Sequence, residues 1–411
     1  MTAMLRERMR HAVASHASAM PRPAAPPSTV DLPPIDRILG GDWHETALGP
    51  VFVRDEWYPL DHEHGALPLS SALDVPAELL ARLLGAVEAP HSSRLAFFDI
   101  ETTGLSGGTG TYVVLAGLGT YEPHGFRMRQ YFLADVGGER AMLAMLATDL
   151  ARFDGLVTYN GRSFDVPVVE TRLTMARVPP PWAGWPHFDL LHPMRRLYRH
   201  RMPGCRLADA ERQLLRIERP DDIPGWLIPS LYFDYLRAGR AAPLRGVFRH
   251  NAEDVLSLVG VLARLARLLD GEALDPEDAV AVARWWEHAG EPQRAMGLYR
   301  EALPWLEGGD DWAWAARRHA ALCKRHGGRH EAVSLWEALH GLGDRAAGLQ
   351  LAIHLEHHAR DPLAAELVTR GLIDGAPSSD RDALEHRLAR LRRKVGAEGY
   401  GEGGRQYVRT G

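Results

Sequence analysis

The sequence predicts an α/β domain built on a mixed β-sheet with flanking helices, followed by an all-α domain of repeat-like helices. Between residues 94 and 269, three apolar runs joined by short glycine-containing connections precede alternating helix and strand patterns. This order is typical of a mixed sheet covered by helices. Beyond residue 271 the chain is rich in alanine, tryptophan and leucine and is helical in pattern. Its 411 residues are enough for two folded domains.

The first 93 residues precede this sheet and divide into two parts. Residues 1–34 are rich in alanine and proline, so we expect a disordered leader. The start of the chain has no continuous apolar stretch, and a secretory signal is not expected. Residues 35–93 contain aromatic residues, prolines and a helical pattern at 77–84, which indicates an ordered N-terminal extension.

The main domain is expected to span residues 94–270. Its first strand begins with a run of four apolar residues, and its last helix has an apolar stripe from Val255 to Leu269. The predicted strands cover 94–101, 111–120, 126–134 and 155–159, with another ending at residue 189; the predicted helices cover 139–152, a segment from about 166, 193–200, 207–215, 230–238 and 250–269.

Residues 271–395 carry a weak internal repeat. Similar segments recur at 295–299, 332–336 and 365–369, at intervals of 37 and 33 residues. This period is typical of tetratricopeptide-like repeats, in which each helix pair buries its apolar face against its neighbours. An irregular helical bundle is the alternative. We expect a protein partner on these helices, since helical arrays commonly serve as docking surfaces, and a flexible tail at 396–411.

Charge and cysteine content restrict the class of protein. The chain has 48 Lys and Arg against 53 Asp and Glu, a net charge of −5, so any nucleic-acid surface must be a local patch. Cys205 and Cys323 have neither disulfide-framework nor zinc-ligand spacing, which favours a reducing, cytoplasmic location. The longest uncharged run contains six glycines, so we expect a soluble protein without a membrane span.

Four carboxylates at the ends of predicted elements are candidate metal ligands. Asp99 and Glu101 follow the first apolar run two residues apart, so both point to the same face of a buried strand. Asp165 precedes Pro167, a residue type favoured in the first turn of a helix, and Asp254 lies on the apolar stripe of the last helix. Inward-pointing acids are costly unless a cation neutralises them. Oxygen ligands suit Mg²⁺ or Mn²⁺, and a pair of such ions supports phosphodiester hydrolysis.

His250 is the candidate residue for proton transfer. It precedes Asp254 by four positions, which places the two side chains about 6 Å apart along a helix on one face. Asp254 can then bind the metal ion while His250 reaches the attacking water. A histidine in the first turn of a helix without a catalytic role is the alternative.

Three motifs carry a family resemblance. They are Asp99-Ile-Glu-Thr-Thr-Gly, Asn160-x-x-x-Phe164-Asp165 and His250-Asn-x-x-Asp254. These three motifs resemble the first, second and third motifs of the RNase-H-like DEDD 3′-to-5′ exonuclease superfamily. The resemblance is closest to the bacterial YprB-like branch of that superfamily. Any one of these motifs can occur by chance in an unrelated sequence, whereas all three in this order are a specific signal of the family. The resemblance spans about residues 94–269, and the helical C-terminal region fits the repeats that some relatives carry.

The resemblance implies an RNase-H-like fold and exonuclease activity. It assigns the metal carboxylates to Asp99, Glu101, Asp165 and Asp254, and the orientation or deprotonation of water to His250. Relatives with a histidine usually place it five residues before the aspartate. The gap here is four, the spacing normally seen with tyrosine, so the role of His250 is less firmly implied than the metal ligands.

Substrate contacts are expected from the motifs and from a basic cluster. Within or beside the motifs, we assign Thr102, Asn160 and Phe164 to substrate binding. A basic cluster follows the strand that ends at residue 189, and its candidate substrate residues are Arg195, Arg196, Tyr198 and Arg199. This cluster either guides a phosphate backbone with the tyrosine stacked on a base or forms a solvated helix face. Asp189 either supports the site or binds an arginine.

The expected function is metal-dependent hydrolysis of single-stranded DNA or RNA from the 3′ end, with two Mg²⁺ or Mn²⁺ ions. Two alternatives remain open. One is a nucleic-acid-binding scaffold whose helical repeats recruit protein partners. The other is a structure-specific endonuclease with the same metal chemistry. The motifs do not distinguish DNA from RNA, because sugar discrimination depends on contacts at the 2′ position.

Overall fold

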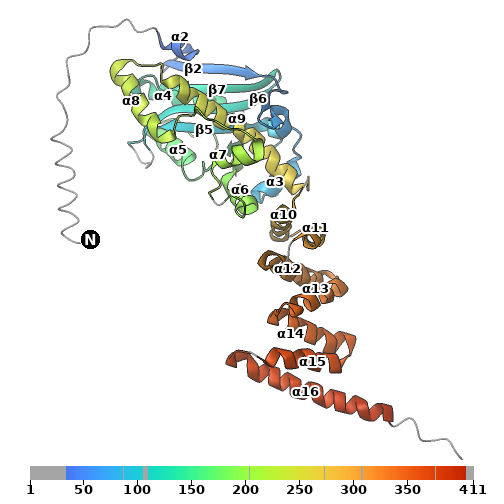
Figure 1. Cartoon of the computed structure of the whole chain (residues 1–411). Helices are drawn as coiled ribbons and strands as arrows, with labels where there is room; N and C mark the ends of the chain where they lie inside the picture. The colour runs from blue at the N-terminus through green and yellow to red at the C-terminus, as the bar shows by residue number, and fades with distance from the viewer. Residues whose placement is uncertain are drawn as a thin grey trace, which may run out of the picture.

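The computed structural model describes residues 34–403 apart from residues 87, 105–109, 203, 273, 307–308 and 375. The expected leader up to residue 33 and the end of the expected tail, 404–411, lie outside the described residues. Figure 1 shows an α/β domain from which a row of helices extends in one direction. The predicted fold class, a mixed sheet with flanking helices followed by a helical region, is confirmed.

A seven-stranded mixed sheet forms the centre of the α/β domain, in the order β1-β2-β7-β6-β5-β8-β9. Strand β5 pairs antiparallel with β6 and parallel with β8, and β9 continues the parallel edge. All strands predicted between residues 94 and 189 are present. They are β5 (Leu95–Thr102), β6 (Val113–Glu122), β7 (Gly125–Phe132), β8 (Gly155–Thr158) and β9 (His187–Asp189).

The N-terminal extension contributes two strands to this sheet, β1 (Asp42–Thr46) and β2 (Gly49–Tyr58). Strand β2 pairs antiparallel with β7, with Phe52 opposite Phe132. Both rings are buried and pack against Phe248. The boundary expected at residue 94 therefore lies inside one sheet, because β2 finds its partner 80 residues further along the chain. The extension also contains a short hairpin of β3 (Glu63–His64) and β4 (Leu67–Pro68).

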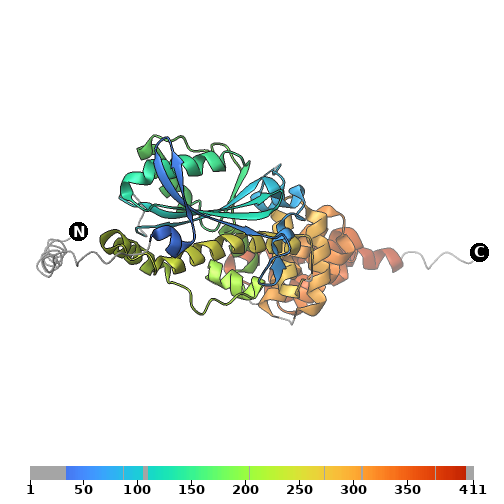
Figure 2. The same cartoon turned by 90° about the horizontal axis from the view of Figure 1, so that it is seen from above.

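Alternation along β5 places its two acids on the face covered by α9 (Leu244–Leu269). Phe98 belongs to the core shared with α4 (Glu139–Leu150) and α5 (Asp165–Ala176). Phe97 points the other way, into the core shared with α9. Figure 2 shows α4 and α9 on opposite sides of the sheet. Because successive strand residues point to opposite faces, the acids two and four residues after Phe97 also face α9.

Helix α9 begins at Leu244, directly after Pro243, six residues before the predicted start. Proline is favoured at helix starts because its φ is fixed and it lacks an N–H. His250 therefore lies in the second turn of the helix and not in the first.

The other helices of this domain are α2 (Ile35–Leu39), α3 (Ala77–Leu84), α6 (Leu191–Tyr198), α7 (Leu207–Ala210), which continues as a π-turn at Glu211–Leu215, and α8 (Ile228–Ala238).

Helices α10 to α16 form the C-terminal region, and each packs against the next along the chain (Figure 1). Helix α10 also packs against α6 and so joins the two regions. Helix α16 continues to Gly403, so residues 396–403 of the expected tail are helical. Among the described residues, no helix has the length and apolar character of a membrane span. The helices are α10 (Pro276–His288), α11 (Pro292–Ala302), α12 (Asp310–His326), α13 (Arg329–Gly341), α14 (Arg345–His354), α15 (Pro362–Ile373) and α16 (Ser378–Gly403).

Candidate active site

Asp99 on β5 is fixed by an amide network from α9. Asn251 Nδ2 donates to Asp99 Oδ2 at 2.9 Å and to the main-chain oxygen of Asp99 at 3.2 Å. Asn251 is fully buried, and its Oδ1 accepts a hydrogen bond from Gln130 Nε2 at 2.9 Å. Gly117 on β6 leaves room for this amide, since a Cβ there would lie 2.4 Å from Asn251 Oδ1. Asn251 and Gln130 thus orient the first metal-ligand candidate, a role that sequence reasoning missed.

Asp165 is the first residue of α5 and is buried. Its Oδ1 accepts a hydrogen bond from the Ile100 amide of β5 at 3.2 Å, which brings the second motif beside the first. Asp189, at the end of β9, holds the turn that precedes Asp165. It accepts hydrogen bonds from the main-chain amides of Asn160 at 2.7 Å and Arg162 at 3.0 Å. Of the two roles considered for Asp189, these contacts match support of the site.

His250 lies between two carboxylates and is oriented by a third. Its Nε2 is 3.6 Å from Glu101 Oε1 and 3.7 Å from Asp254 Oδ2. Its Nδ1 is 2.8 Å from Asp222 Oδ1. Asp222 is therefore placed to accept the Nδ1 proton, and Nε2 faces the other two carboxylates. Sequence reasoning missed Asp222, because it lies in an irregular loop outside the three motifs.

Arg219 forms an ion-pair cluster at the edge of the site. Its guanidinium donates to Asp254 Oδ1 at 2.6 Å and to Glu211, and it lies 3.3 Å from Glu253 Oε2. Only 10% of the Arg219 side chain is exposed. This arginine therefore neutralises charge next to a candidate metal ligand. It was also missed, since it lies 35 positions before Asp254 in the same irregular loop.

Burial and mutual repulsion raise the pKa of three carboxyl groups in the site. The pKa values of Asp99 and Glu101 lie well above their usual range, because both groups are largely removed from solvent and face Asp254 and Asp165. Burial raises the pKa of Asp165 to about 7, against the opposing effect of hydrogen bonds from main-chain amides. The four carboxylates therefore share one region and repel each other. A hard divalent cation would relieve this repulsion, and carboxylate oxygens are the ligands it prefers.

The predicted substrate residues of the motifs lie close to these carboxylates. Thr102 is buried, and its hydroxyl donates to the main-chain oxygen of Gly104 at 2.7 Å, so it shapes the turn after β5. Phe164 is partly buried at the edge of the core. Asn160 is exposed and adopts the left-handed conformation, with φ 64°, which asparagine tolerates better than most residues. Of the three side chains, Asn160 is the most accessible to a substrate.

The basic cluster on α6 has one buried and three exposed members. Tyr198 is only 3% exposed, so its ring is not available to a base, and the prediction that it stacks on substrate was wrong. The reason is the orientation of α6, whose apolar face points into the core and includes position 198. The exposed members are Arg195, Arg196 and Arg199.

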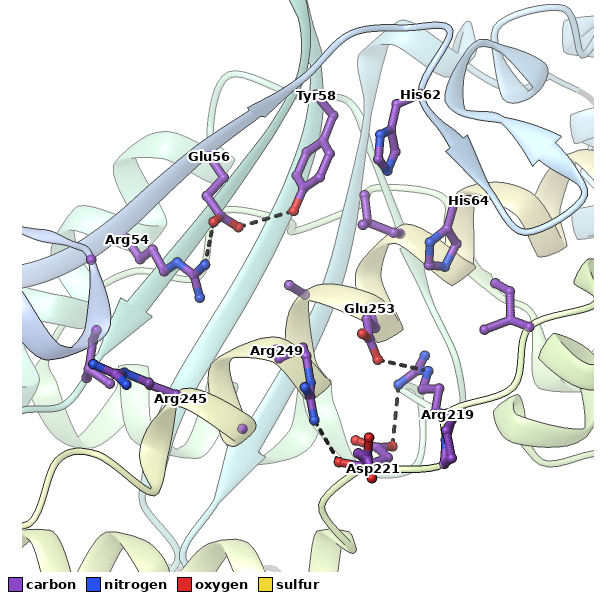
Figure 3. A pocket seen from close by; sticks show the side chains of 18 of the residues that line it. Arg54, Glu56, Tyr58, His62, His64, Arg219, Asp221, Arg245, Arg249 and Glu253 are labelled. Atoms are coloured by element: carbon purple, nitrogen blue, oxygen red, sulfur yellow. Dashed lines mark hydrogen bonds and ion pairs between the residues drawn. The ribbon is translucent and has the colours of Figure 1, made fainter.

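A cavity of about 930 Å³ lies beside the site, next to the loop that carries Arg219 (Figure 3). Its walls come from α2, β2, α9 and this loop. Two of its arginines are partnered: Arg54 pairs with Glu56, and Arg249 donates to the main-chain oxygen of Asp221 at 2.6 Å. The cavity was not predicted, because segments far apart in the sequence form it.

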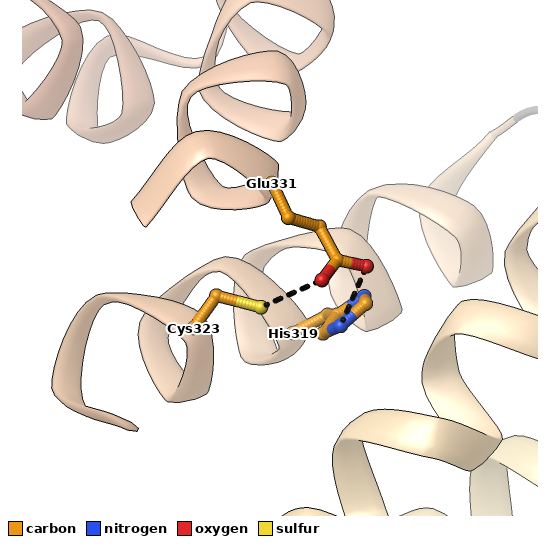
Figure 4. A group of neighbouring side chains, drawn as sticks. All are labelled: His319, Cys323 and Glu331. Carbon is orange, nitrogen blue, oxygen red and sulfur yellow. Dashed lines mark hydrogen bonds and ion pairs between the residues drawn. The ribbon is translucent and has the colours of Figure 1, made fainter. Parts of the chain in front are cut away.

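A second group of titratable residues lies in the helical region. Among the described residues, only His319, Cys323 and Glu331 bring three potential ligand atoms within 4.8 Å of one another (Figure 4). The active-site carboxylates are more widely spaced. Arg300 donates to both oxygens of Glu331 at 2.9 Å, and burial raises the pKa of the Cys323 thiol to about 12. Because a cation would compete with Arg300 and with the thiol proton, we interpret this group as a polar contact between α12 and α13.

Comparison with known proteins places the α/β domain in one class, the RNase H-like proteins. The family model described as RNase_H superfamily matches residues 96–266, a range that includes all the candidate metal ligands. The protein of Bacillus subtilis (strain 168) named "Uncharacterized protein YprB" is 32% identical over 375 residues, which cover 86% of this chain and 90% of that protein. The chain therefore belongs to the RNase H superfamily, in the family of YprB.

Membership of this superfamily has a chemical consequence. It indicates a nucleic-acid hydrolase, and therefore a protein that binds nucleic acid. RNase H-like nucleases generally use divalent metal ions, which agrees with the donor set of this site.

Proposed function

We propose that this chain is a metal-dependent nuclease that removes nucleotides from the 3′ end of single-stranded DNA or RNA. The observation that carries the proposal is the convergence of Asp99, Glu101, Asp165 and Asp254 from three elements, with His250 beside Glu101 and Asp254. The resemblance of the three motifs to those of DEDD exonucleases supports the 3′-to-5′ direction.

The four carboxylates would hold two Mg²⁺ or Mn²⁺ ions, which when bound supply Lewis-acid stabilisation of charge on the scissile phosphate. His250 would handle the proton. With its Nδ1 proton held by Asp222, His250 Nε2 accepts a proton from the attacking water. The Asp222 carboxylate then stabilises the imidazolium that forms, as a carboxylate does beside other catalytic histidines. Asn251 keeps Asp99 in place through its hydrogen bond.

The test is a gel time course on 5′-labelled single-stranded DNA and RNA oligonucleotides with free or blocked 3′ ends, in Mg²⁺, Mn²⁺ or EDTA. We expect a ladder that shortens from the free 3′ end only in the presence of metal. Asp99→Asn abolishes it, whereas Asp61→Asn, at an exposed carboxylate outside the site, leaves it unchanged. Equal metal-dependent cleavage by wild type and Asp99→Asn would contradict the assignment of the site.

A circular single-stranded substrate separates end-dependent from internal cleavage. An exonuclease leaves the circle intact while it digests the same sequence after linearisation. Cleavage of the circle at a similar rate would replace the exonuclease proposal by a structure-specific endonuclease with the same metal ligands.

A nucleic-acid-binding scaffold is the second candidate, and the contact between Arg219 and Asp254 is the observation that favours it. The 2.6 Å bond gives one candidate metal ligand a cationic partner within the chain. In that case α10 to α16 would offer docking surface for a protein partner. Tight binding of oligonucleotides without cleavage in either metal would support the scaffold, and metal-dependent cleavage that requires Asp99 would exclude it.

A further inference from the structure

A cavity of about 810 Å³ lies where the α/β domain meets the helical region. Its walls come from α6, α10 and α12, and α10 packs directly against α6. Exposed arginines dominate its lining on both sides of the junction: Arg195, Arg196 and Arg199 from α6, and Arg284 from α10. We call these four residues the junction arginines. Two acids, Glu277 and Asp311, also line the cavity.

The junction arginines are not neutralised by direct ion pairs with described residues. None of the four forms an ion pair with a described residue, whereas Arg201, one turn beyond the end of α6, contacts three carboxylates at 2.6 to 3.9 Å. The contrast matters because the chain as a whole has a net charge of −5. Unpaired arginines concentrated in one cavity of an acidic protein indicate an anion-binding surface.

Packing holds two of these arginines close to each other. The Arg196 guanidinium lies 4.3 Å from the ring centroid of Trp285, and that of Arg284 lies 5.5 Å from the centroid of Trp314. Burial and the charge of Arg284 lower the pKa of Arg196, so the two cations repel each other. A bound phosphate group would relieve this repulsion, and the partly exposed Trp314 ring offers an aromatic surface next to it.

Smaller hollows connect this cavity with the turn that precedes Asp165. A hollow of about 220 Å³ is lined by Arg162 of that turn and by Asp189, which accepts a hydrogen bond from the Arg162 amide. It shares Leu83, His192 and Pro193 with a hollow of about 270 Å³. The second hollow in turn shares Arg196 and His288 with the junction cavity. Because neighbouring hollows share lining residues, we treat the three as one groove, which runs from Arg162 and Asp189 to the helical region.

We propose that this groove binds the phosphate backbone of single-stranded nucleic acid at a distance from the end that is hydrolysed. The inference rests on the proposed nuclease function and names the route of its substrate. The proposed nuclease acts on a single strand, so a single strand is the occupant. Arginine forks bind phosphate oxygens in a bidentate manner, and the helical region thereby becomes part of the substrate site.

The test measures binding without cleavage. Fluorescence anisotropy of a 5′-fluorescein single-stranded 20-mer of DNA and of RNA is recorded in EDTA over a series of NaCl concentrations. The test variant is Arg199→Gln with Arg284→Gln, one substitution on each side of the junction. The matched control is Arg240→Gln with Arg325→Gln, at exposed positions outside the groove. Circular dichroism checks that all variants are folded.

We expect the test variant to bind the 20-mer more weakly and with a lower salt dependence. Each phosphate contact of a single strand contributes about 0.7 to the slope of log K against log salt, so loss of two contacts lowers the slope by about 1.4. The control pair keeps the wild-type slope.

The outcomes separate the groove from the nuclease activity. A folded test variant with wild-type affinity and slope for the 20-mer would overturn the groove, even if the wild type cleaves. A reduced slope in a protein that never cleaves with metal would support the groove and overturn the nuclease proposal alone. Failure of the wild type to bind either 20-mer would overturn the groove and leave cleavage to be judged by the gel assay.

Discussion

Replacement of Arg219 by methionine probes the ion-pair cluster at the edge of the site. Arg219 and its partner Glu211 have side chains only 10% and 5% exposed, so the substitution leaves a buried carboxylate without its cation. Removal of one partner of a buried ion pair costs about 3–5 kcal/mol. Ser257 still donates to Glu211 at 2.5 Å and retains part of the stabilisation. We therefore expect a loss of about 3 kcal/mol, while methionine preserves much of the apolar packing of the arginine stem.

The measurement must report the α/β domain alone, because a chain with two regions need not unfold in one step. Hydrogen–deuterium exchange of peptides from β5 and α9 in increasing urea gives the free energy of unfolding of this domain. Arg237→Met is the matched control, since Arg237 is 73% exposed and pairs with exposed Asp234; its effect stays within about 0.5 kcal/mol. Adding Glu211→Gln to Arg219→Met restores most of the loss. A loss below about 1 kcal/mol, or no rescue by the second substitution, would refute the reasoning.

Three further predictions concern metal, pH and packing. Mg²⁺ or Mn²⁺ raises the thermal midpoint of the wild type in differential scanning fluorimetry, and Asp99→Asn removes this rise; an equal rise in the variant would place the ion elsewhere. Burial lowers the pKa of His64 from 6.5 to about 4, so the stability that neutral His64 provides is present above pH 6.5 and is lost as the pH falls toward 4. This loss is at most about 3 kcal/mol. Between pH 6.5 and pH 4, the free energy of unfolding of His64→Gln, measured with urea, varies less with pH than that of the wild type. An equal pH dependence in both proteins would show that the assignment is wrong. Gly117→Ala lowers the free energy of unfolding by about 1–3 kcal/mol, because the new Cβ meets the Asn251 amide. Gly371→Ala does not lower it, since a Cβ at Gly371 has nothing within 4 Å. Equal thermal midpoints for the two variants would contradict this prediction.

Local patterns predicted the central strands and the covering helices, because these elements bury long apolar runs or stripes. Strand β5 opens with four fully buried residues, and α9 has buried residues along its whole length. The strands β1 and β2 were not predicted. Strand β1 has no fully buried residue, and the pairing of β2 depends on a strand 80 residues away, so neither has a local signature.

The same distinction applies to the candidate site. Asp99, Glu101 and Asp254 stand in motifs, and their spacing on a strand and a helix predicted which way they point. Asp222 and Arg219 lie in an irregular loop, and only its packing against α9 brings them to the site. Sequence reasoning therefore found the groups expected to bind metal and missed those that orient or neutralise them.

The position of β2 in the sheet has a consequence for synthesis of the chain. Phe52 is made 80 residues before Phe132, opposite which it lies. At about 5–20 residues per second, this delay lasts about 4–16 s. During that time the β1–β2 hairpin presents an unpaired main-chain edge, which is a template for pairing with other nascent chains. A shortened chain that begins at residue 96, where the superfamily match starts, would instead leave β7 uncovered for good, so recombinant production of the domain has to include β1 and β2.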